Sequence, residues 1–539
     1  MLSRTGAAAA GARMYNRRAE GNFMVSYRFL LFSCALLPAF PLAARDYFVS
    51  ASGDDAGAAT EAAPWRTLAK VSAASFQPGD RILLAGGQTF AGPLELGKDD
   101  RGTAARNIVV TSYGAGRAVI DGGTGRAVTI DGCDHVVVRR LKLVGAGRKT
   151  GNTADGLYLG HSTGSTVEEI EVTGFRHSGV EISGTEDARI VRVHAHGNGF
   201  AGIRSGGDLS KNLYIGYCLT ENNPGDPTIR KNHSGNGIIV SRTEVALVEF
   251  CESRFNGWDQ PWTGNGPVGI WTHDADRVVI QYNIAHHNRS TAADGGGFDF
   301  DGGVTNSALQ YNYSHDNYGS GYLICQYDGA PRFANNVVRY NVSQDDGLFD
   351  HNAGIFVWVG GKDMESTLVH NNTIWNTKGS AVAYGVDKRY AKPMPEVTFY
   401  NNIFVSQGPQ IFSRTEGVGK VGTFRGNLYW ARGERGFRVE GYKSLKEWAD
   451  ATGQETMNGK LVGLFADPAL DKSGHGLLTN PEDLKRLIEY RLLRGSPAAG
   501  AGLDLRKAFG IDPGRVDFYG SRLPAQGPLT IGAHEALEK

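Results

Sequence analysis

Two aspartates occupy alternate positions of a short predicted strand, Phe298 to Asp301, which has glycines on both sides. Side chains of a strand alternate between its faces, so Phe298 and Phe300 point one way while Asp299 and Asp301 point the other. The Cα atoms of the two aspartates are about 6.5 Å apart, which is two strand rises. Carboxyl groups this close are costly to leave unpaired. They predict either an acid/base pair or a cation site.

The strand that carries these aspartates is one rung of a repeat. An apolar strand that ends in an aromatic–Asn or Asn–Asn step returns at intervals of 29, 29, 31 and 30 residues. The steps end at Asn283, Asn312, Asn341, Asn372 and Asn402. Such a period indicates a coiled solenoid whose rungs form parallel sheets, with neighbouring rungs about 4.8 Å apart. Stacked asparagines can bond to one another, so we interpret this column as structural. Cys218 and Cys251 occupy the same column upstream, where we expect stacked thiols rather than a redox pair.

A second strand, introduced by glycine, recurs once in each repeat, and its register predicts which side chains face outward. One outward row reads Tyr158, Glu181, Arg204, Ile239, Trp271, Asp299, Leu323 and Phe356. The row beside it reads Gly160, Ser183, Gly206, Ser241, His273, Asp301, Cys325 and Trp358. The two aspartates are therefore expected between Trp271 and His273 on one side and Phe356 and Trp358 on the other.

Long loops lead into the rungs around the aspartates, at residues 221–236, 256–267, 286–296 and 344–353. Long loops on one side of a solenoid usually wall a binding groove. The loops carry the candidate binding residues Lys231, His233, Trp258 and Trp262, a third candidate carboxylate, Asp294, and also Arg230, Asp259, Asp345, Asp346, Asp350 and His351. Tryptophans beside carboxylates suit sugars, because sugar faces stack on the rings while carboxylates act on the glycosidic oxygen.

Several other polar residues receive a structural interpretation. Arg204 is expected to pair with Glu181 on the neighbouring rung, with a substrate carboxylate as its alternative partner. His194 and His196 alternate on a strand like a metal pair, but no third ligand is evident in the sequence. The pairs 286–287 (His-His) and 315–316 (His-Asp) follow the asparagine column and are interpreted as turn residues.

The N-terminus has the pattern of a targeting segment. Basic Arg28 precedes an apolar run from Phe29 to Leu37, and small residues follow up to Ala44. This order predicts a signal peptide within a leader of residues 1–44, with Met24 as a credible alternative start. We therefore expect a secreted or periplasmic protein with no stable membrane span after cleavage.

Composition agrees with a protein of short strands and tight turns. The 539 residues include Gly 74, near twice the usual share of glycine. The formal net charge is zero, so nothing indicates a nucleic-acid partner. We expect a monomer with residues 45–125 as N-terminal cap and first coils, 126–420 as the parallel β-helix that carries the groove, and 421–539 as C-terminal coils and cap.

Both ends of the predicted mature chain carry motifs that resemble a known family. The first segments are Asp46-Tyr47-Phe48-Val49-Ser50, Gly53-Asp54-Asp55, Pro64-Trp65-Arg66-Thr67-Leu68 and Pro78-Gly79-Asp80 before an apolar run; the last are Asp467-Pro468-Ala469-Leu470, Arg494-Gly495-Ser496-Pro497-Ala498 and Ile531-Gly532-Ala533-His534-Glu535. Their order resembles exported right-handed parallel β-helix proteins of the pectate-lyase-like fold, which include polysaccharide lyases and glycoside hydrolases. The resemblance implies an all-β, single-stranded right-handed parallel β-helix solenoid with capping segments at both ends, and a polysaccharide or oligosaccharide substrate. It is specific for fold and weak for reaction.

Glycoside hydrolysis is the first hypothesis for the reaction. It needs one protonated and one ionised carboxyl group across the scissile bond, and it requires no cofactor. Asp299 and Asp301 are the expected pair, with Asp294 as a third carboxylate and His273 beside them. Burial against Trp271 would raise a pKa and mark the acid.

Two alternatives remain open. The first is a calcium-dependent polysaccharide lyase or C5 epimerase acting on uronic acids, with Asp294, Asp299 and Asp301 as Ca²⁺ ligands and His273 or Lys231 as base. This arrangement is similar to pectate lyases of the Asp-rich β-helix kind, although no lysine stands on the central rows here. The second is a carbohydrate-binding or surface β-helix protein without catalysis.

Overall fold

The computed structural model describes residues 43–349, 353–361, 364–387, 396–414, 418, 421–431, 436–471 and 476–536. Residues 44–539 form one compact unit. The predicted signal peptide and the loop residues Asp350 and His351 lie outside the described residues. Within the described part of the chain, no helix is long and apolar enough to cross a membrane.

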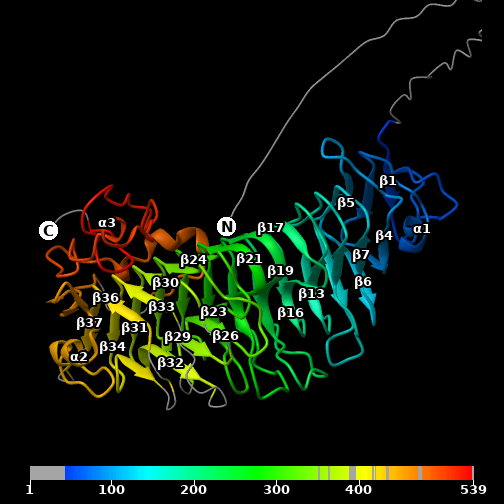
Figure 1. Ribbon diagram of the computed structural model, residues 1–539. Helices are drawn as coiled ribbons and strands as arrows, with labels where there is room; N and C mark the ends of the chain where they lie inside the picture. Colours follow the sequence, from blue (N-terminus) through cyan, green and yellow to red (C-terminus); the bar gives the residue numbers. More distant parts are fainter. Residues whose placement is uncertain are drawn as a thin grey trace, which may run out of the picture. The chain divides into compact units, whose positions relative to one another are not determined.

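The chain folds into a right-handed parallel β-helix, as the sequence predicts, and almost all strand pairs are parallel (Figure 1). The strands stack in three columns, and two long strands, β19 (Asn236–Glu249) and β21 (Val268–Gln281), run through the first and second columns. The sequence predicted two of these columns. The third contains strands of only two to six residues that directly follow the first column.

The first column comprises β1 (Asp46–Val49), β2 (Arg81–Ala85), β5 (Ile108–Tyr113), β8 (Val136–Arg139), β11 (Thr166–Glu168), β14 (Arg189–Val191), β17 (Ser210–Gly216), β24 (Ala308–Gln310), β27 (Val337–Arg339), β30 (Thr367–His370), β33 (Val397–Tyr400) and β36 (Thr423–Arg425). The second comprises β4 (Leu94–Leu96), β7 (Val128–Asp131), β10 (Leu157–Gly160), β13 (Ser178–Ser183), β16 (Ala201–Ser205), β23 (Gly296–Phe300), β26 (Tyr322–Gln326), β29 (Ala353–Val359), β32 (Ser380–Val386) and β35 (Phe412–Arg414). The third comprises β3 (Thr89–Ala91), β6 (Ala118–Gly123), β9 (Leu141–Gly145), β12 (Glu171–Thr173), β15 (His194–His196), β18 (Leu219–Glu221), β20 (Glu252–Arg254), β22 (Ile284–His286), β25 (Tyr313–His315), β28 (Val342–Gln344), β31 (Thr373–Asn376), β34 (Ile403–Ser406), β37 (Leu428–Ala431) and β40 (Leu464–Phe465).

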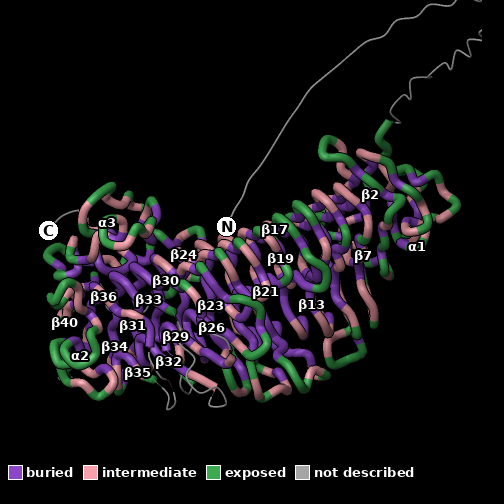
Figure 2. Tube along the Cα trace, in the orientation of Figure 1, coloured by how far each residue is buried: buried purple, intermediate pink, exposed green. Residues whose placement is uncertain are grey.

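The core fills the inside of the coil, because every second side chain of a rung points inward. Phe298 and Phe300 of β23 are fully buried in this core, and Phe298 stacks on Tyr322 of the next rung with ring centroids 5.4 Å apart. Figure 2 shows the buried rungs continuing along the stacked coils. The inward phenylalanines therefore fix the outward direction of Asp299 and Asp301.

The predicted asparagine column forms a continuous hydrogen-bonded ladder, which we call the asparagine ladder; it comprises Asn283, Asn312, Asn341, Asn372, Asn402 and Asn427. The side-chain amide of Asn283 donates to Asn312 Oδ1 at 3.0 Å, and the pattern repeats up the stack. The last amide donates to the buried carboxyl of Glu455 at 2.7 Å.

The two cysteines extend this ladder as predicted. The backbone N–H of Cys251 donates to Asn283 Oδ1 at 2.8 Å, and that of Cys218 donates to Cys251 Sγ at 3.4 Å. Both thiols are buried and free. A second ladder, which the sequence analysis missed, follows the third column through Asn198, Asn223, Asn256, Asn288 and Asn317 to Asp346.

Short helices stand near both ends of the described solenoid. Helix α1 (Leu68–Ser72) begins after Thr67, whose side chain accepts from Lys70 N–H, and it buries Leu68 and Val71. Helix α2 (Leu445–Thr452) buries Trp448 edge-on against Phe424 of the last first-column rung. The remaining short elements are the antiparallel pair β38 (Thr456–Met457) and β39 (Lys460–Leu461), the 3₁₀ helices η1 (Pro481–Arg486) and η2 (Ile488–Tyr490), and α3 (Leu505–Phe509).

The C-terminal segment 476–536 lies along the flank of the solenoid instead of only covering its last rung. Tyr313 of β25 donates its hydroxyl hydrogen to Gly476 O at 2.8 Å, and Tyr311 donates to Val516 O at 3.2 Å. Apolar residues of the segment, such as Ile531, join these tyrosines in a second buried cluster. The segment therefore supports the middle rungs.

Candidate active site

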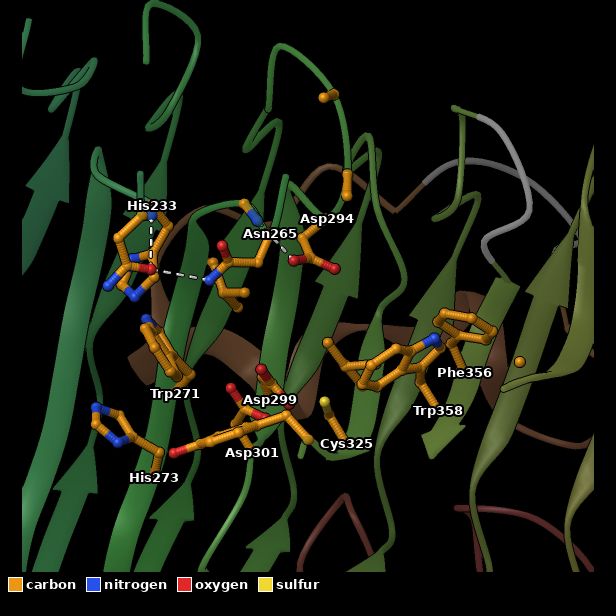
Figure 3. Close-up of a pocket in the computed structure, with 18 of the residues that line it drawn as sticks. His233, Asn265, Trp271, His273, Asp294, Asp299, Asp301, Cys325, Phe356 and Trp358 are labelled. Atoms are coloured by element: carbon orange, nitrogen blue, oxygen red, sulfur yellow. Dashed lines mark hydrogen bonds between the residues drawn. The ribbon is translucent and has the colours of Figure 1, made fainter. Parts of the chain in front are cut away.

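The register around the two aspartates is the predicted one. Asp299 of β23 pairs with Trp271 of β21 and with Leu323 of β26, and Leu323 pairs with Phe356 of β29. Cys325 pairs with Trp358 in the neighbouring row. Figure 3 shows the aspartates between Trp271 and His273 on one side and Phe356 and Trp358 on the other.

A cavity of about 1090 Å³ opens over this part of the second column. Eight of the predicted site residues line it: His233, Trp271, His273, Asp294, Asp299, Asp301, Phe356 and Trp358. Loop residues such as Asn232, Asn265 and Phe349 complete its walls, as the long loops predicted.

Asp299 lies at the floor of this cavity. Its residue surface is only 2% exposed, and its Oδ1 atom is buried without a hydrogen-bond partner. Desolvation raises the pKa of Asp299 well above its ordinary value, and the negative charges of Asp301 and Asp294 raise it further. These effects favour a protonated Asp299.

Asp301 occupies a more polar environment. Its Oδ1 accepts from the backbone N–H of Gly302 at 2.8 Å, and the Cys325 thiol also donates to its carboxylate. Desolvation raises the pKa of Asp301, but these two hydrogen bonds and the nearby His273 oppose the rise. Asp301 is therefore the member of the pair that ionises more readily.

Asp294 enters the cavity from the loop that precedes β23. Its backbone is left-handed, with φ 57°, and its Oδ2 accepts from Gly266 N–H at 2.8 Å. Burial raises the pKa of Asp294 to about 6 despite this hydrogen bond, and the charge of Asp301 adds to the rise. The cavity thus holds three carboxyl groups that cannot all ionise without strong repulsion.

The aromatic side chains differ in what they offer to a ligand. Trp271 donates its indole N–H to Asn236 Oδ1 at 3.1 Å, and the His233 ring meets it edge-on at 5.1 Å. Trp271 is only 4% exposed, so it is a rigid wall. His273 stacks on Trp271 at 5.1 Å, and its Nδ1 lies 3.3 Å from Asp274 Oδ2. Trp358, on the other side, is only half-buried and lines the cavity.

Four of the predicted binding residues do not line the cavity: Arg204, Lys231, Trp258 and Trp262. Arg204 forms the expected ion pair with Glu181, and its guanidinium lies 5.3 Å from the ring of Phe200. Lys231 and Trp258 are exposed on their loop surfaces. Trp262 is linked to the cavity indirectly: its indole N–H donates to Asn265 Oδ1 at 2.7 Å, and Asn265 lines the cavity.

Sequence reasoning missed several lining residues. Tyr327 lies two positions beyond Cys325, so continuing the alternation along this strand by one more outward residue would have found it. Asn265 and Phe349 come from loops that have no period. No sequence signal could have placed their side chains over the second column.

The three aspartates were also expected as calcium ligands if the protein were a lyase. Calcium takes oxygens at about 2.3–2.6 Å, so carboxylates sharing one ion must bring their oxygens close together. Among the described residues, the acidic, histidine and cysteine side chains that meet within 4.8 Å as a group of three are His286, His287 and His315. The geometry therefore does not support one calcium ion held by all three aspartates, and calcium stays a prediction.

Comparisons with known proteins agree with this fold. The model of the right-handed β-helix region family matches residues 226–404, which include Asp294, Asp299 and Asp301. The solved structures similar to this chain include a GH136 lacto-N-biosidase from Eubacterium ramulus, with 20% identity over 70% of this chain and 68% of that one and a TM-score of 0.46. They also include the pectate lyase Pel9A, with 15% identity over 91% and 96% of the two chains and a TM-score of 0.43.

One curated relative matches more closely over a short stretch. A lacto-N-biosidase from Bifidobacterium longum subsp. longum is 44% identical over 71 residues, which is 13% of this chain and 4% of that protein. The fold and the family model together define this protein as a right-handed parallel β-helix protein.

Proposed function

We propose that this protein is a glycoside hydrolase that acts on an uncharged glycan, with Asp299 as general acid and Asp301 as the ionised carboxylate. The observation that carries the proposal is the contrast within the pair. Asp299 is desolvated and has an unpartnered oxygen, while Asp301 accepts hydrogen bonds from Gly302 and Cys325. Pairs of carboxyl groups whose environments separate their pKa values are the usual acid/base arrangement of glycosidases.

The proposed reaction uses both groups in one step. Protonated Asp299 gives its proton to the glycosidic oxygen as the C1–O bond breaks, and the bonding electrons stay with that oxygen. Asp301 takes a proton from a water molecule, whose oxygen forms the new bond to C1 from the opposite face. Two strand rises separate the Cα atoms by about 6.5 Å, so the two carboxyl groups can reach the wider spacing of inverting enzymes when their side chains splay apart.

The cavity lining favours a neutral sugar. None of the described residues that line it is Lys or Arg, while three are aspartates. A uronic acid would bring a further negative charge to this group, and no lysine or arginine among the described lining residues would offset it. Trp358 and Phe356 provide an apolar surface on which sugar rings can stack.

Two further observations support a carbohydrate-acting enzyme. The short match at 44% identity is to a lacto-N-biosidase, and the family-model match spans the cavity residues. Export, inferred from the N-terminal pattern, is part of the proposal because polymeric glycans are met outside the cytoplasm.

The test is a digestion of neutral, pectic and alginate-like polysaccharides and neutral oligosaccharides with two assays on the same samples. Reducing ends report any cleavage, and ultraviolet absorbance reports the unsaturated products of elimination. We expect reducing ends from a neutral glycan, no absorbance and no effect of EDTA. Asp299→Asn and Asp301→Asn should abolish the signal, and Asp99→Asn, on an exposed turn, should retain it.

Each other result would contradict the proposal in a defined way. Absorbance that EDTA removes would make the protein a calcium-dependent lyase, with His273 as the candidate base. Altered uronic-acid composition without cleavage would indicate a C5 epimerase. Glycan binding without turnover at any pH would leave a binding protein.

A further inference from the structure

Three histidines meet in the third column, and none of them lines the cavity. His286 ends β22, His315 ends β25, and His287 follows His286. His286 and His315 are register partners on adjacent rungs, and their rings stack with centroids 4.5 Å apart and 6° between planes. One ring nitrogen from each of the three lies within 4.8 Å of the others.

The hydrogen bonds of His286 decide which of its nitrogens carries the proton. Its Nε2 lies 3.0 Å from Glu252 Oε1, and a carboxylate oxygen can only accept from it. In neutral His286 the other nitrogen, Nδ1, then carries a lone pair and no proton. It faces Nδ1 of His287 at 2.8 Å, so the lone pair points into the histidine group.

His315 is arranged in the same way with its nitrogens exchanged. Its Nδ1 lies 2.9 Å from Asp316 Oδ2, so Nδ1 carries the proton. The remaining nitrogen, Nε2, is buried and has no hydrogen-bond partner, although the residue is only 1% exposed. A buried, unpartnered lone pair is unfavourable, and it indicates a ligand that would take it up.

We propose that His286, His287 and His315 bind a divalent transition-metal ion, with Zn²⁺ as the expected ion. Neutral imidazoles are the common nitrogen ligands of Zn²⁺, which suits three ligands and an open position. Ligating histidines usually donate their other ring N–H to a carboxylate, as His286 does to Glu252 and His315 does to Asp316. His287 is half-buried and provides access from solvent.

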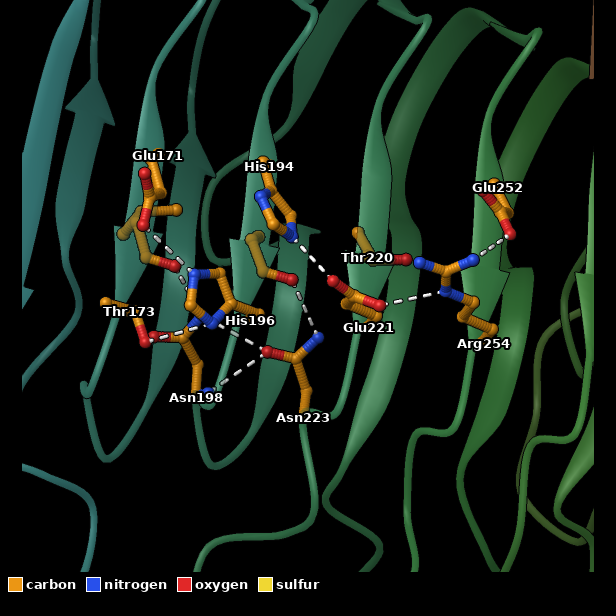
Figure 4. Close-up of polar contacts among 12 residues, drawn as sticks. Glu171, Thr173, His194, His196, Asn198, Thr220, Glu221, Asn223, Glu252 and Arg254 are labelled. Atoms are coloured by element: carbon orange, nitrogen blue, oxygen red, sulfur yellow. Dashed lines mark hydrogen bonds and ion pairs between the residues drawn. The ribbon is translucent and has the colours of Figure 1, made fainter. Parts of the chain in front are cut away.

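The other histidine pair of the third column shows what an ordinary structural arrangement looks like. His194 Nε2 lies 2.9 Å from Glu221 Oε1, and His196 Nε2 lies 3.3 Å from Glu171 Oε1. Figure 4 shows both contacts, and the one to Glu221 continues through Arg254 to Glu252. The His194 side chain is 38% exposed, so water can satisfy its other nitrogen, and Nδ1 of His196 lies 3.3 Å from Thr173 Oγ1. This pair is the matched control for the proposed site.

The bound ion would join two adjacent rungs, because His286 and His315 belong to β22 and β25. Anything that binds only the folded state raises its stability. The site is therefore expected to contribute to stability at a distance from the cavity, and its existence does not depend on the proposed hydrolase activity.

The test measures zinc binding to the purified full-length protein after EDTA treatment and removal of the chelator. Equilibrium dialysis with ZnCl₂ and metal analysis should give one tightly bound zinc per chain, and the thermal midpoint should rise with zinc. Co²⁺ should give visible d–d absorption that zinc then displaces. His287→Asn should weaken zinc binding by at least about tenfold. Asparagine tolerates the left-handed backbone at this position, where φ is 54°, so this variant is expected to fold.

The controls separate this site from other zinc ligands. His194→Asn and Asp299→Asn should bind zinc like the unaltered protein, and His315→Gln should lose binding. The proposal is overturned if the unaltered protein binds no stoichiometric zinc. It is equally overturned if folded His287→Asn and His315→Gln, confirmed by circular dichroism, bind zinc with unchanged affinity.

Discussion

The asparagine ladder and Asp299 at the floor of the cavity are both buried polar groups of the solenoid, but their hydrogen bonding differs. In the ladder, Asn312 accepts from Asn283 and donates to Asn341, so each amide meets a partner. In the cavity, Asp299 keeps a buried oxygen with no partner. Polar groups that hold a fold are satisfied within it, whereas groups left desolvated and unpaired are available for chemistry.

The largest effect should come from removing the unpartnered acid. Asp299→Asn should lower kcat on the glycan substrate by about a hundred- to ten-thousand-fold, the usual contribution of a general acid. Its thermal midpoint should stay the same or rise, because a neutral amide replaces a desolvated carboxyl group. Steady-state kinetics and a thermal melt of the same preparation measure both. A large loss of stability with retained activity would show that Asp299 holds the fold and does not act in the reaction.

Disrupting the asparagine ladder should instead lower the stability of the fold. Asn312→Ala removes the oxygen that accepts from both the backbone N–H and the side-chain amide of Asn283. It also removes the amide donor to Asn341 Oδ1, which keeps only the backbone N–H of residue 312. Each buried group left unsatisfied costs about 1–3 kcal/mol, so the free energy of unfolding should fall by about 3 kcal/mol. Denaturant unfolding measures it.

The control for the ladder variant is Gln310→Ala, two residues earlier on β24. Gln310 makes its hydrogen bonds to Gln281 and Arg339 where solvent reaches them, so this change should cost less than about 1 kcal/mol. Equal losses in the two variants would show that ladder burial contributes nothing special.

A smaller, pH-dependent effect is expected at the edge of the cavity. The pKa of Asp294 in the folded protein is about 6, above its ordinary value of 3.8. The folded state therefore binds this proton more tightly than the unfolded chain, and stability falls as pH rises from about 4 to about 6. Asp294→Asn should stabilise the protein by up to about 3 kcal/mol above pH 6 and change little at pH 4, since one pKa unit corresponds to about 1.4 kcal/mol. Thermal melts at both pH values test the sign, and a gain only at low pH would contradict it.

The smallest effect should come from extending the ladder. Cys251 accepts from Cys218 N–H through sulfur, and its own N–H donates to Asn283. Cys251→Asn would place an amide in line with the ladder and should raise the free energy of unfolding by up to about 1 kcal/mol. Cys251→Ala, which can make no such bonds, is the control and should be destabilised. If both variants lose stability equally, an asparagine at position 251 does not join the hydrogen bonds of the ladder.

Much of the fold could be predicted because the same sequence motifs recur at a regular interval along the chain. The Asn steps from Asn283 onward set the rungs, and the alternation of Phe298 and Phe300 with the aspartates set the faces. The predicted outward pairings Trp271–Asp299 and Asp299–Leu323 are those of the structure. The third column was missed because strands such as Ile284–His286 are too short to show an alternation of their own.

The site was predicted less completely. The outward residues of the rungs around Asp299 line the cavity, whereas Arg204 lies on an earlier rung, and Lys231, Trp258 and Trp262 come from loops and lie away from the lining. Asn265 and Phe349, from similar loops, do line it. A loop has no period, so its side-chain directions depend on contacts that the sequence does not display.

The histidine group shows the same division between local and tertiary information. His286 and His315 stand 29 residues apart, at the same step of the repeat as their asparagines, so their stacking follows from the period. The choice of carboxylate partners, Glu252 and Asp316, does not. The fold selects which ring nitrogen keeps its lone pair, and that selection converts predicted turn residues into a candidate metal site.

The sequence by itself determined the solenoid, the asparagine ladder and the face on which Asp299 and Asp301 stand, since these depend on a two-residue alternation within a repeated period. Only the tertiary structure decided how the two aspartates differ. Loops around the cavity leave Asp299 2% exposed and without a partner for Oδ1, while Gly302 and Cys325 donate to Asp301. The pKa of a carboxyl group depends on desolvation and hydrogen bonding, and here the desolvation and the hydrogen bond from Cys325 come from other rungs and loops.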